Sequence, residues 1–154
     1  MNVKIDKRAK FRQWLEKAEH DLVTAKCALR ILGDRPYDAI CFHAQQCAEK
    51  YFKSLLFWLD IDFPKTHDLR ALIQLLPPLI SKQITIDEVL PLNRYAIAAR
   101  YPEEWEPITR SEAKAALAMA RRIRRLIRQQ FPRSALRTGK PGNKVSDEQR
   151  LRRI

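Results

Sequence analysis

The sequence predicts an all-α protein: an up-and-down bundle of four to five helices followed by a disordered, basic C-terminal tail. Three observations support this prediction. Apolar residues recur at steps of three and four over long stretches of the chain. Glycine occurs only three times in 154 residues, at Gly33, Gly139 and Gly142, so little interrupts the helices. Positive charge collects near the end of the chain, beyond the last periodic stretch.

The first two predicted helices form an antiparallel pair. A helix from about residue 6 to residue 32 is expected to bury one stripe, made of Phe11, Trp14, Ala18, Leu22, Ala25, Leu29 and Leu32. Gly33 is a natural stop, and a short turn to Pro36 leads into a second helix that runs to about residue 60. Its apolar side consists of Ile40, Ala44, Cys47, Ala48, Tyr51, Leu55, Leu56 and Leu59. Such a short loop joins helices that pack antiparallel.

Three further helices are marked by prolines and capping residues. A short helix is expected over residues 68–76, ended by the two prolines at 77 and 78. Thr85 and Glu88 have capping-box spacing, so a fourth helix begins there, and Pro91 kinks or restarts it before residue 99. Thr109 and Glu112 repeat this spacing at the head of a fifth helix.

The fifth helix has a core side and a basic side. The core side consists of Ala113, Ala116, Leu117, Ala120, Ile123, Ile127 and Phe131. The basic side consists mainly of Arg121, Arg122, Arg125 and Arg128. We therefore expect one bundle domain over residues 6–131 and a tail over 132–154, which has no aromatic residue and many cations.

Charge and hydropathy limit the classes of function. Residues 121–154 hold twelve Lys and Arg against two acids, so they carry +10 of the net charge of +12. This asymmetry indicates an acidic partner such as RNA, DNA or an acidic protein, or else a solubilising tail. No apolar run approaches the roughly 20 residues of a membrane span, and no signal-peptide core follows Met1. We expect a cytoplasmic protein that does not enter a membrane.

The three cysteines, Cys27, Cys41 and Cys47, form no Cys-x-x-Cys pair and have no histidine at zinc-finger spacing. They are interpreted as small buried hydrophobic residues in a reducing compartment. We expect no metal site and no cofactor.

A polar stripe on the second helix supplies candidate functional residues. On a helical wheel these lie opposite the apolar side: His43, Gln46, Glu49, Lys50 and Lys53. Glu49 and Lys53 stand at i and i+4 with the acid first, the orientation that stabilises a helix. The stripe is either a solvated face or a surface that contacts a ligand.

Three segments of the sequence resemble the HEPN family of prokaryotic helical domains. They are AQQCAEKYFKSLL at residues 44–56, KTHDL at 65–69 and ARYP at 99–102. The similarity extends over about residues 10–131. It implies a bundle of four or five helices that forms a homodimer and is often encoded beside a minimal nucleotidyltransferase as a toxin–antitoxin pair. Several lineages of the family are metal-independent endoribonucleases.

The resemblance implies that activity in those enzymes depends on an Arg that is followed, after four to six residues, by a His. Metal-free RNA cleavage needs a group that moves protons and a cation that stabilises charge on phosphate. Here Arg100 is followed by Trp105, Glu106 and Pro107 where the His would stand. Two other pairs, Arg12 with His20 and Arg35 with His43, are each separated by seven residues. The standard ribonuclease signature is missing.

Several interpretations of these residues stay open. His67 beside Asp68, or else His43, can meet Arg100 in space and rebuild a catalytic pair. Alternatively the cleft binds a nucleotide or RNA without cutting it; its candidate residues are His43, Gln46, Glu49, Lys50, Lys53, Asp68, Arg100 and Tyr101. The structural alternative is that Asp68 or Thr66 caps the third helix and that Arg100 pairs with Glu49.

Three hypotheses of function follow. The leading one is a HEPN subunit that binds nucleotide or RNA and works with a minimal nucleotidyltransferase, without the standard ribonuclease motif. The second is a metal-independent endoribonuclease whose rearranged catalytic pair is His67 and Arg100. The third is a non-enzymatic nucleic-acid binder whose affinity resides in the basic tail.

Overall fold

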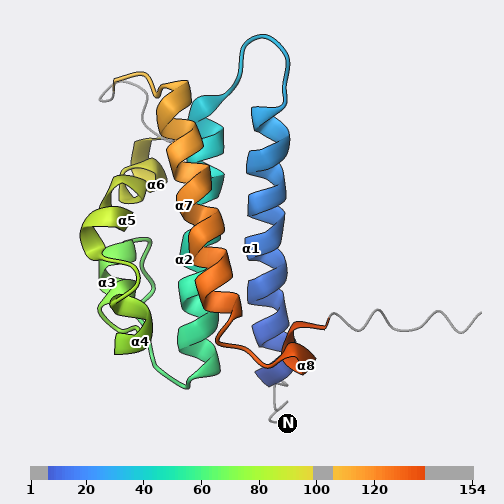
Figure 1. Cartoon of the computed structure of the whole chain (residues 1–154), viewed down its shortest axis with the longest axis vertical. Helices are drawn as coiled ribbons and strands as arrows, with labels where there is room; N and C mark the ends of the chain where they lie inside the picture. Colours follow the sequence, from blue (N-terminus) through green and yellow to red (C-terminus); the bar gives the residue numbers. More distant parts are fainter. Residues whose placement is uncertain (1–6, 99–105, 138–154) are drawn as a thin grey trace, which may run out of the picture.

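Three long helices run side by side through the protein (Figure 1). They are α1 (Lys7–Leu29), α2 (Tyr37–Trp58) and α7 (Arg110–Arg128). This computed structural model describes residues 7–98 and 106–137, and within those ranges it holds helices and no strand. The predicted all-α bundle is confirmed. No helix in these two ranges combines the length and the apolar character that crossing a membrane requires.

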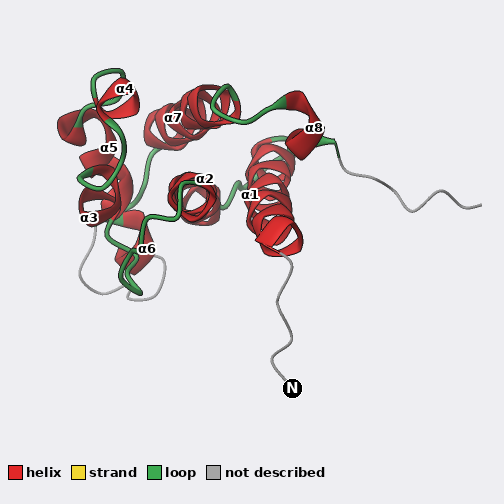
Figure 2. Ribbon diagram, turned by 90° about the horizontal axis from the view of Figure 1, so that it is seen from below, coloured by secondary structure: helices red, strands yellow, loops and turns green. Residues whose placement is uncertain are grey.

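Helix α2 lies between α1 and a group of short helices (Figure 2). The short helices are α3 (Leu69–Ile73), α4 (Pro78–Ser81), α5 (Ile86–Asn93) and α6 (Tyr95–Ala98). Helix α7 packs against α2, and α8 (Arg133–Leu136) lies beside the beginning of α1 (Figure 1). Because elements surround α2 on several sides, its buried residues include Gln45, Glu49 and Lys53 as well as the expected apolar ones.

The predicted apolar sides of the long helices form the core with few exceptions. Its largest fully buried side chains include Phe11 of α1, Tyr51 and Phe52 of α2, and Ile123 of α7. Burying each of these aromatic or branched side chains contributes about 1.5–3 kcal/mol. Leu59, predicted on the apolar side of α2, is instead exposed, since it follows the last residue of that helix.

Helix α1 ends three residues earlier than predicted. The amides of Arg30 and Ile31 bond to carbonyls three residues back, which tightens the last turn instead of continuing an α-helix. Gly33 has φ 84°, a conformation that favours glycine and turns the chain toward α2. Leu32 is consequently 89% exposed, so its predicted place on the buried stripe is wrong.

Both predicted capping boxes are present. Thr85 caps α5, with its hydroxyl accepting from the Glu88 amide and the Glu88 carboxylate accepting from the Thr85 amide. Thr109 and Glu112 make the same reciprocal pair at the start of α7. Helix α5 continues past Pro91 to Asn93, and α6 restarts at Tyr95. Two strong N-terminal caps of this kind contribute about 1 kcal/mol each.

The double proline begins a short helix, and the preceding helix ends before it. Helix α3 stops at Ile73, and Pro78 occupies the first turn of α4. Proline suits this position because the first amides of a helix have no partner within it. The helix predicted over residues 68–76 is therefore shorter than expected, and α4 was not predicted.

Helical structure extends past residue 131, into the segment predicted to be tail. Helix α8 follows Pro132, and Ala135 and Leu136 pack partly buried against the core. Residues 138–154 lie outside the described ranges.

Candidate functional site

His67 meets a buried ion pair on α2. Lys53 Nζ donates to Glu49 Oε1 at 2.7 Å, and Nδ1 of His67 lies 3.1 Å from Glu49 Oε2. Glu49 and Lys53 are only 3% and 6% exposed, whereas the His67 side chain is 60% exposed. Lys53 also donates to the carbonyl of Thr66 at 2.8 Å, which fixes the loop that carries His67. The carboxylate thus orients a histidine that remains open to solvent.

Two glutamines complete this network. Gln45 Nε2 donates to Glu49 Oε2 and to the backbone carbonyl of His67, both at 3.2 Å. Gln46 Nε2 donates to Gln45 Oε1 at 2.7 Å. Gln45 is fully buried, and it was not among the residues predicted for the site. The one signal for it in the sequence is a polar residue on the apolar side of the helical wheel, next to Ala44.

Asp68 caps α3 and links it to α5. Its Oδ1 accepts from the Arg70 amide at 2.9 Å and from Asn93 Nδ2 at 2.6 Å. Asn93 Oδ1 accepts in turn from the Leu69 amide at 2.8 Å. The hydrogen bond from Asn93 lowers the pKa of Asp68 below its ordinary value. Asp68 therefore has the capping role that was one of its two predicted alternatives, and Asn93 is a partner that was not predicted.

A groove opens beside His67, between the start of α3 and the α5–α6 segment. It has a volume of about 470 Å³, and its polar lining comes from His67, Asp68, Arg70, Asn93 and Arg94. Leu90, Ala96 and Ile97 supply the apolar lining. The groove is thus bordered by two arginines and one exposed histidine.

Arg94 is the most constrained cation of this groove. Its Nη2 donates to Glu112 Oε1 at 2.6 Å, and its guanidinium carbon lies 5.1 Å from the centre of the Tyr95 ring. Its buried Nε has no hydrogen-bond acceptor among the described residues. The Arg94 side chain as a whole is 35% exposed, so its accessible guanidinium nitrogens can also meet an oxygen acceptor such as phosphate. Arg94 was not among the predicted site residues.

His43 and Lys50 belong to a different cluster, against α1. His43 Nδ1 lies 2.8 Å from Asp21 Oδ1, and Lys50 Nζ pairs with Asp21 Oδ2. The predicted polar stripe therefore divides in two. Glu49 and Lys53 contact the loop that carries His67, and Gln46 bonds to Gln45 in the same network. His43 and Lys50 instead contact Asp21 of α1.

Arg100 and Tyr101 lie outside the described residues. A contact of Arg100 with His67, His43 or Glu49 therefore stays a prediction. Among residues 7–98 and 106–137, no group of three or more His, Cys, Asp or Glu side chains is arranged to hold a metal ion.

The cysteines divide between core and surface. Cys41 and Cys47 are buried as predicted, and burial raises the pKa of each thiol to about 12. Such thiols stay protonated and unreactive near neutral pH. Cys27 is exposed near the end of α1, so the prediction that all three are buried is wrong.

The basic side of α7 is partly neutralised. Arg122 pairs with Glu88 at 2.6 Å, and Arg128 lies 3.6 Å from Glu19. Arg121 and Arg125 are exposed and form no ion pair with any described residue. Of the four arginines predicted for this side, Arg121 and Arg125 therefore have no neutralising partner among the described residues.

Comparisons with known proteins agree with this architecture. Residues 11–130 match the HEPN domain family. The crystal structure of TT1696 from Thermus thermophilus is similar, with 32% identity over 79% of this chain and 98% of that chain and a TM-score of 0.65. The structure of ST0689, an archaeal HEPN homologue, shares 26% identity over 78% of this chain and 96% of that chain, with a TM-score of 0.58. No curated protein matches the chain. The match over residues 11–130 shows that this chain belongs to the HEPN domain family.

Proposed function

We propose that this chain is a HEPN subunit that binds RNA or a nucleotide in the His67 groove and works beside a minimal nucleotidyltransferase. The observation that carries the proposal is the position of His67, which is held by the buried Glu49 carboxylate at 3.1 Å yet is open to a groove bordered by Arg70 and Arg94.

The charges of the groove favour an anionic ligand. Arg70 is exposed, and the Arg94 side chain is 35% exposed although it pairs with Glu112. Asp68, the one carboxylate among the described lining residues, already accepts hydrogen bonds from Asn93 and the Arg70 amide. A phosphate placed here gains charge-assisted hydrogen bonds and meets little uncompensated negative charge. A nearby apolar wall, including Ile97, suits the face of a base or sugar.

Fluorescence polarisation with a labelled single-stranded RNA tests this site. His67→Ala and Arg70→Ala are each expected to weaken binding about ten-fold, the loss of one charge-assisted hydrogen bond. Lys82→Ala is the matched control, because it removes an exposed cation outside the groove. Equal affinity for the groove variants and the control variant would exclude the groove as the binding site.

A tail variant separates this proposal from binding through the C-terminal cations. Its substitutions are Lys140→Gln, Lys144→Gln, Arg150→Gln, Arg152→Gln and Arg153→Gln. If the groove provides the specific affinity, this variant binds more weakly mainly at low salt, because the tail cations add unspecific attraction. Complete loss of binding at all salt concentrations would place the affinity in the tail.

Membership of the HEPN family supports a toxin–antitoxin partnership and a homodimer. Co-expression with a minimal nucleotidyltransferase encoded next to this gene, followed by light scattering on the purified material, tests both. We expect a complex that contains two copies of this chain. A monomer that does not bind the nucleotidyltransferase would contradict this part of the proposal.

A second candidate function is metal-independent RNA cleavage. The contact between His67 Nδ1 and Glu49 favours it, because a carboxylate that holds one ring nitrogen leaves Nε2 available to move a proton. In that reaction the 2′-hydroxyl gives up its proton and its oxygen bonds to the adjacent phosphorus. The bond from phosphorus to the 5′-oxygen breaks, and this oxygen takes up a proton, so the products are a 2′,3′-cyclic phosphate and a 5′-hydroxyl. Cleavage in EDTA that is abolished by His67→Ala and by Arg100→Ala would establish it. Intact RNA after prolonged incubation would contradict RNA cleavage and leave only the binding function.

A further inference from the structure

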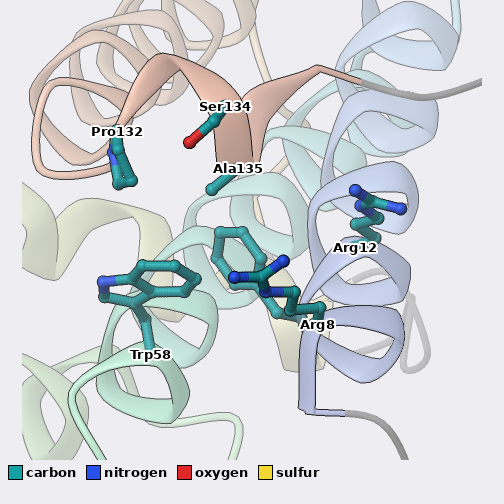
Figure 3. Close-up of a pocket in the computed structure, with 7 residues that line it drawn as sticks. Arg8, Arg12, Trp58, Pro132, Ser134 and Ala135 are labelled. Carbon is teal, nitrogen blue, oxygen red and sulfur yellow. The ribbon is translucent and has the colours of Figure 1, made fainter.

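A second pocket lies at the end of the bundle where α1 begins, α2 ends and α8 crosses (Figure 3). Its volume is about 270 Å³. Arg8 and Arg12 of α1 border one side, Trp58 of α2 lies across from them, and α8 closes the pocket from above (Figure 3). This pocket shares no lining residue with the His67 groove.

The floor of the pocket is aromatic and firmly packed. The Phe11 ring centre lies 4.8 Å from that of Trp58 and 4.7 Å from that of Phe131, and Trp58 and Phe131 are 5.8 Å apart. Phe11 and Phe131 are buried, whereas Trp58 is only half-buried. The indole therefore offers part of its surface to the pocket from a fixed position, as a stacking partner for a planar ring requires.

The rim of the pocket is cationic. Arg8 and Arg12 are one helical turn apart, so both side chains extend from the same side of α1. No described Asp or Glu lines the pocket, and within the described ranges Arg12 forms no ion pair. Ser134 of α8 adds a hydroxyl group to the lining. A guanidinium beside an aromatic platform selects a ligand that is both planar and negatively charged.

We propose that this pocket binds one nucleotide, with its base stacked on Trp58 and its phosphate held by Arg12. The volume limits the ligand, because pockets for drug-sized molecules begin at about 300 Å³. A base with a single phosphate is of the right size, and a dinucleotide cofactor is too large. This proposal does not depend on the His67 groove. The nucleotide is either a free nucleoside monophosphate or the phosphorylated end of an RNA strand.

Indole N–H signals in NMR spectra of the ¹⁵N-labelled full chain test the proposal. The chain has three tryptophans, and the spectrum of Trp58→Phe identifies the Trp58 signal by its loss. Titration with AMP is expected to shift the Trp58 signal in a saturable way. Adenosine is expected to produce a weaker shift, and inorganic phosphate almost none, because stacking and charge must act together. A 5′-phosphorylated RNA trinucleotide, compared with AMP, distinguishes the strand end from the free nucleotide.

Variants separate this pocket from the groove. Arg12→Ala is expected to weaken AMP binding about ten-fold or more, as loss of a charge-assisted contact does. Arg30→Ala, which removes an exposed cation beyond the other end of α1, and His67→Ala should each leave the Trp58 titration unchanged. A Trp58 signal that stays in place at millimolar AMP would overturn the proposal. So would a titration that is the same in Arg12→Ala as in the unaltered chain.

Discussion

Nε of Arg124 lies 2.6 Å from Oε1 of Glu19, so the last long helix pairs with the first across 105 positions of sequence. The Tyr51 hydroxyl of α2 donates to the same carboxylate. One half-buried acid therefore joins α1, α2 and α7. Burial raises the pKa of Glu19, but the hydrogen bonds from Arg124 and Tyr51 outweigh it and hold this pKa below its ordinary value.

Removing this shared carboxylate should loosen the packing of the three long helices. Glu19→Ala leaves Arg124 and the Tyr51 hydroxyl without their acceptor, so we expect the free energy of unfolding to fall by about 2–3 kcal/mol. Urea denaturation followed by circular dichroism measures this change. Glu16→Ala is the control, since Glu16 lies exposed 3.9 Å from His20 and should change stability by less than about 0.5 kcal/mol. Equal losses in both variants would mean that Glu19 does not join the helices.

The stability of the bundle should fall in acid. Hydrogen bonds from the Thr85 amide and from Arg122 lower the pKa of Glu88 from 4.5 to about 2. A carboxyl whose pKa is lower in the folded state stabilises the fold above its unfolded pKa, and this stabilisation is lost as pH falls through the folded pKa. Glu88 therefore contributes fully above about pH 4.5 and progressively less down to about pH 2.

Glu88→Gln should reduce this dependence on pH. The urea midpoint of the variant is expected to lie below that of the unaltered chain near neutral pH, and the difference should shrink below about pH 4.5 and close near pH 2. Asp87→Gln is a suitable control, because Asp87 is an exposed neighbour in the same first helical turn. A constant gap between the two midpoints at all pH values would contradict the assigned role of Glu88.

The buried pair of Glu49 and Lys53 should respond differently to single and double substitution. Lys53→Met leaves Glu49 buried without its lysine, so we expect a loss of about 3 kcal/mol or more. Changing both residues, as Glu49→Gln with Lys53→Met, removes the unpaired charge and should restore most of the stability. A double-mutant cycle from denaturation measures the coupling. Additive losses would show that the two charges act independently despite their separation of 2.7 Å.

Local signals made the helices predictable. Capping boxes at Thr85 and Thr109 depend on residues three positions apart, so the sequence alone reveals them. The polar side of α2 was harder to interpret, because its surroundings are tertiary. Lys53 and Glu49 are buried since the loop at Thr66 and His67 lies over them, and no helical wheel contains that loop.

The candidate site was predictable only in part, for the same reason. His67 was selected from the sequence, but its contact with Glu49 joins residues 18 positions apart. Arg94 and Asn93 reach the groove because α5 ends beside the start of α3, a placement that depends on the packing of several short helices. The prediction for Leu32 failed because helical periodicity in the sequence continues past the point where α1 ends. Cys27 was expected to be buried as a small hydrophobic residue, but it lies off the buried side of α1 and is exposed.

Exposed cations on α7 should set the salt dependence of RNA binding. Arg121 and Arg125 lie one turn apart on the solvent side of α7 and form no ion pair with a described residue, so they are available to RNA phosphates. Each lost phosphate contact lowers the slope of log affinity against log salt by about 0.7 for a single strand. Replacing both with Gln should therefore reduce the slope by about 1.4. The same double substitution at Arg30 and Lys82, which are exposed elsewhere, serves as the control for net charge. If both double variants reduce the slope equally, the attraction reflects total charge and α7 makes no direct contact with RNA.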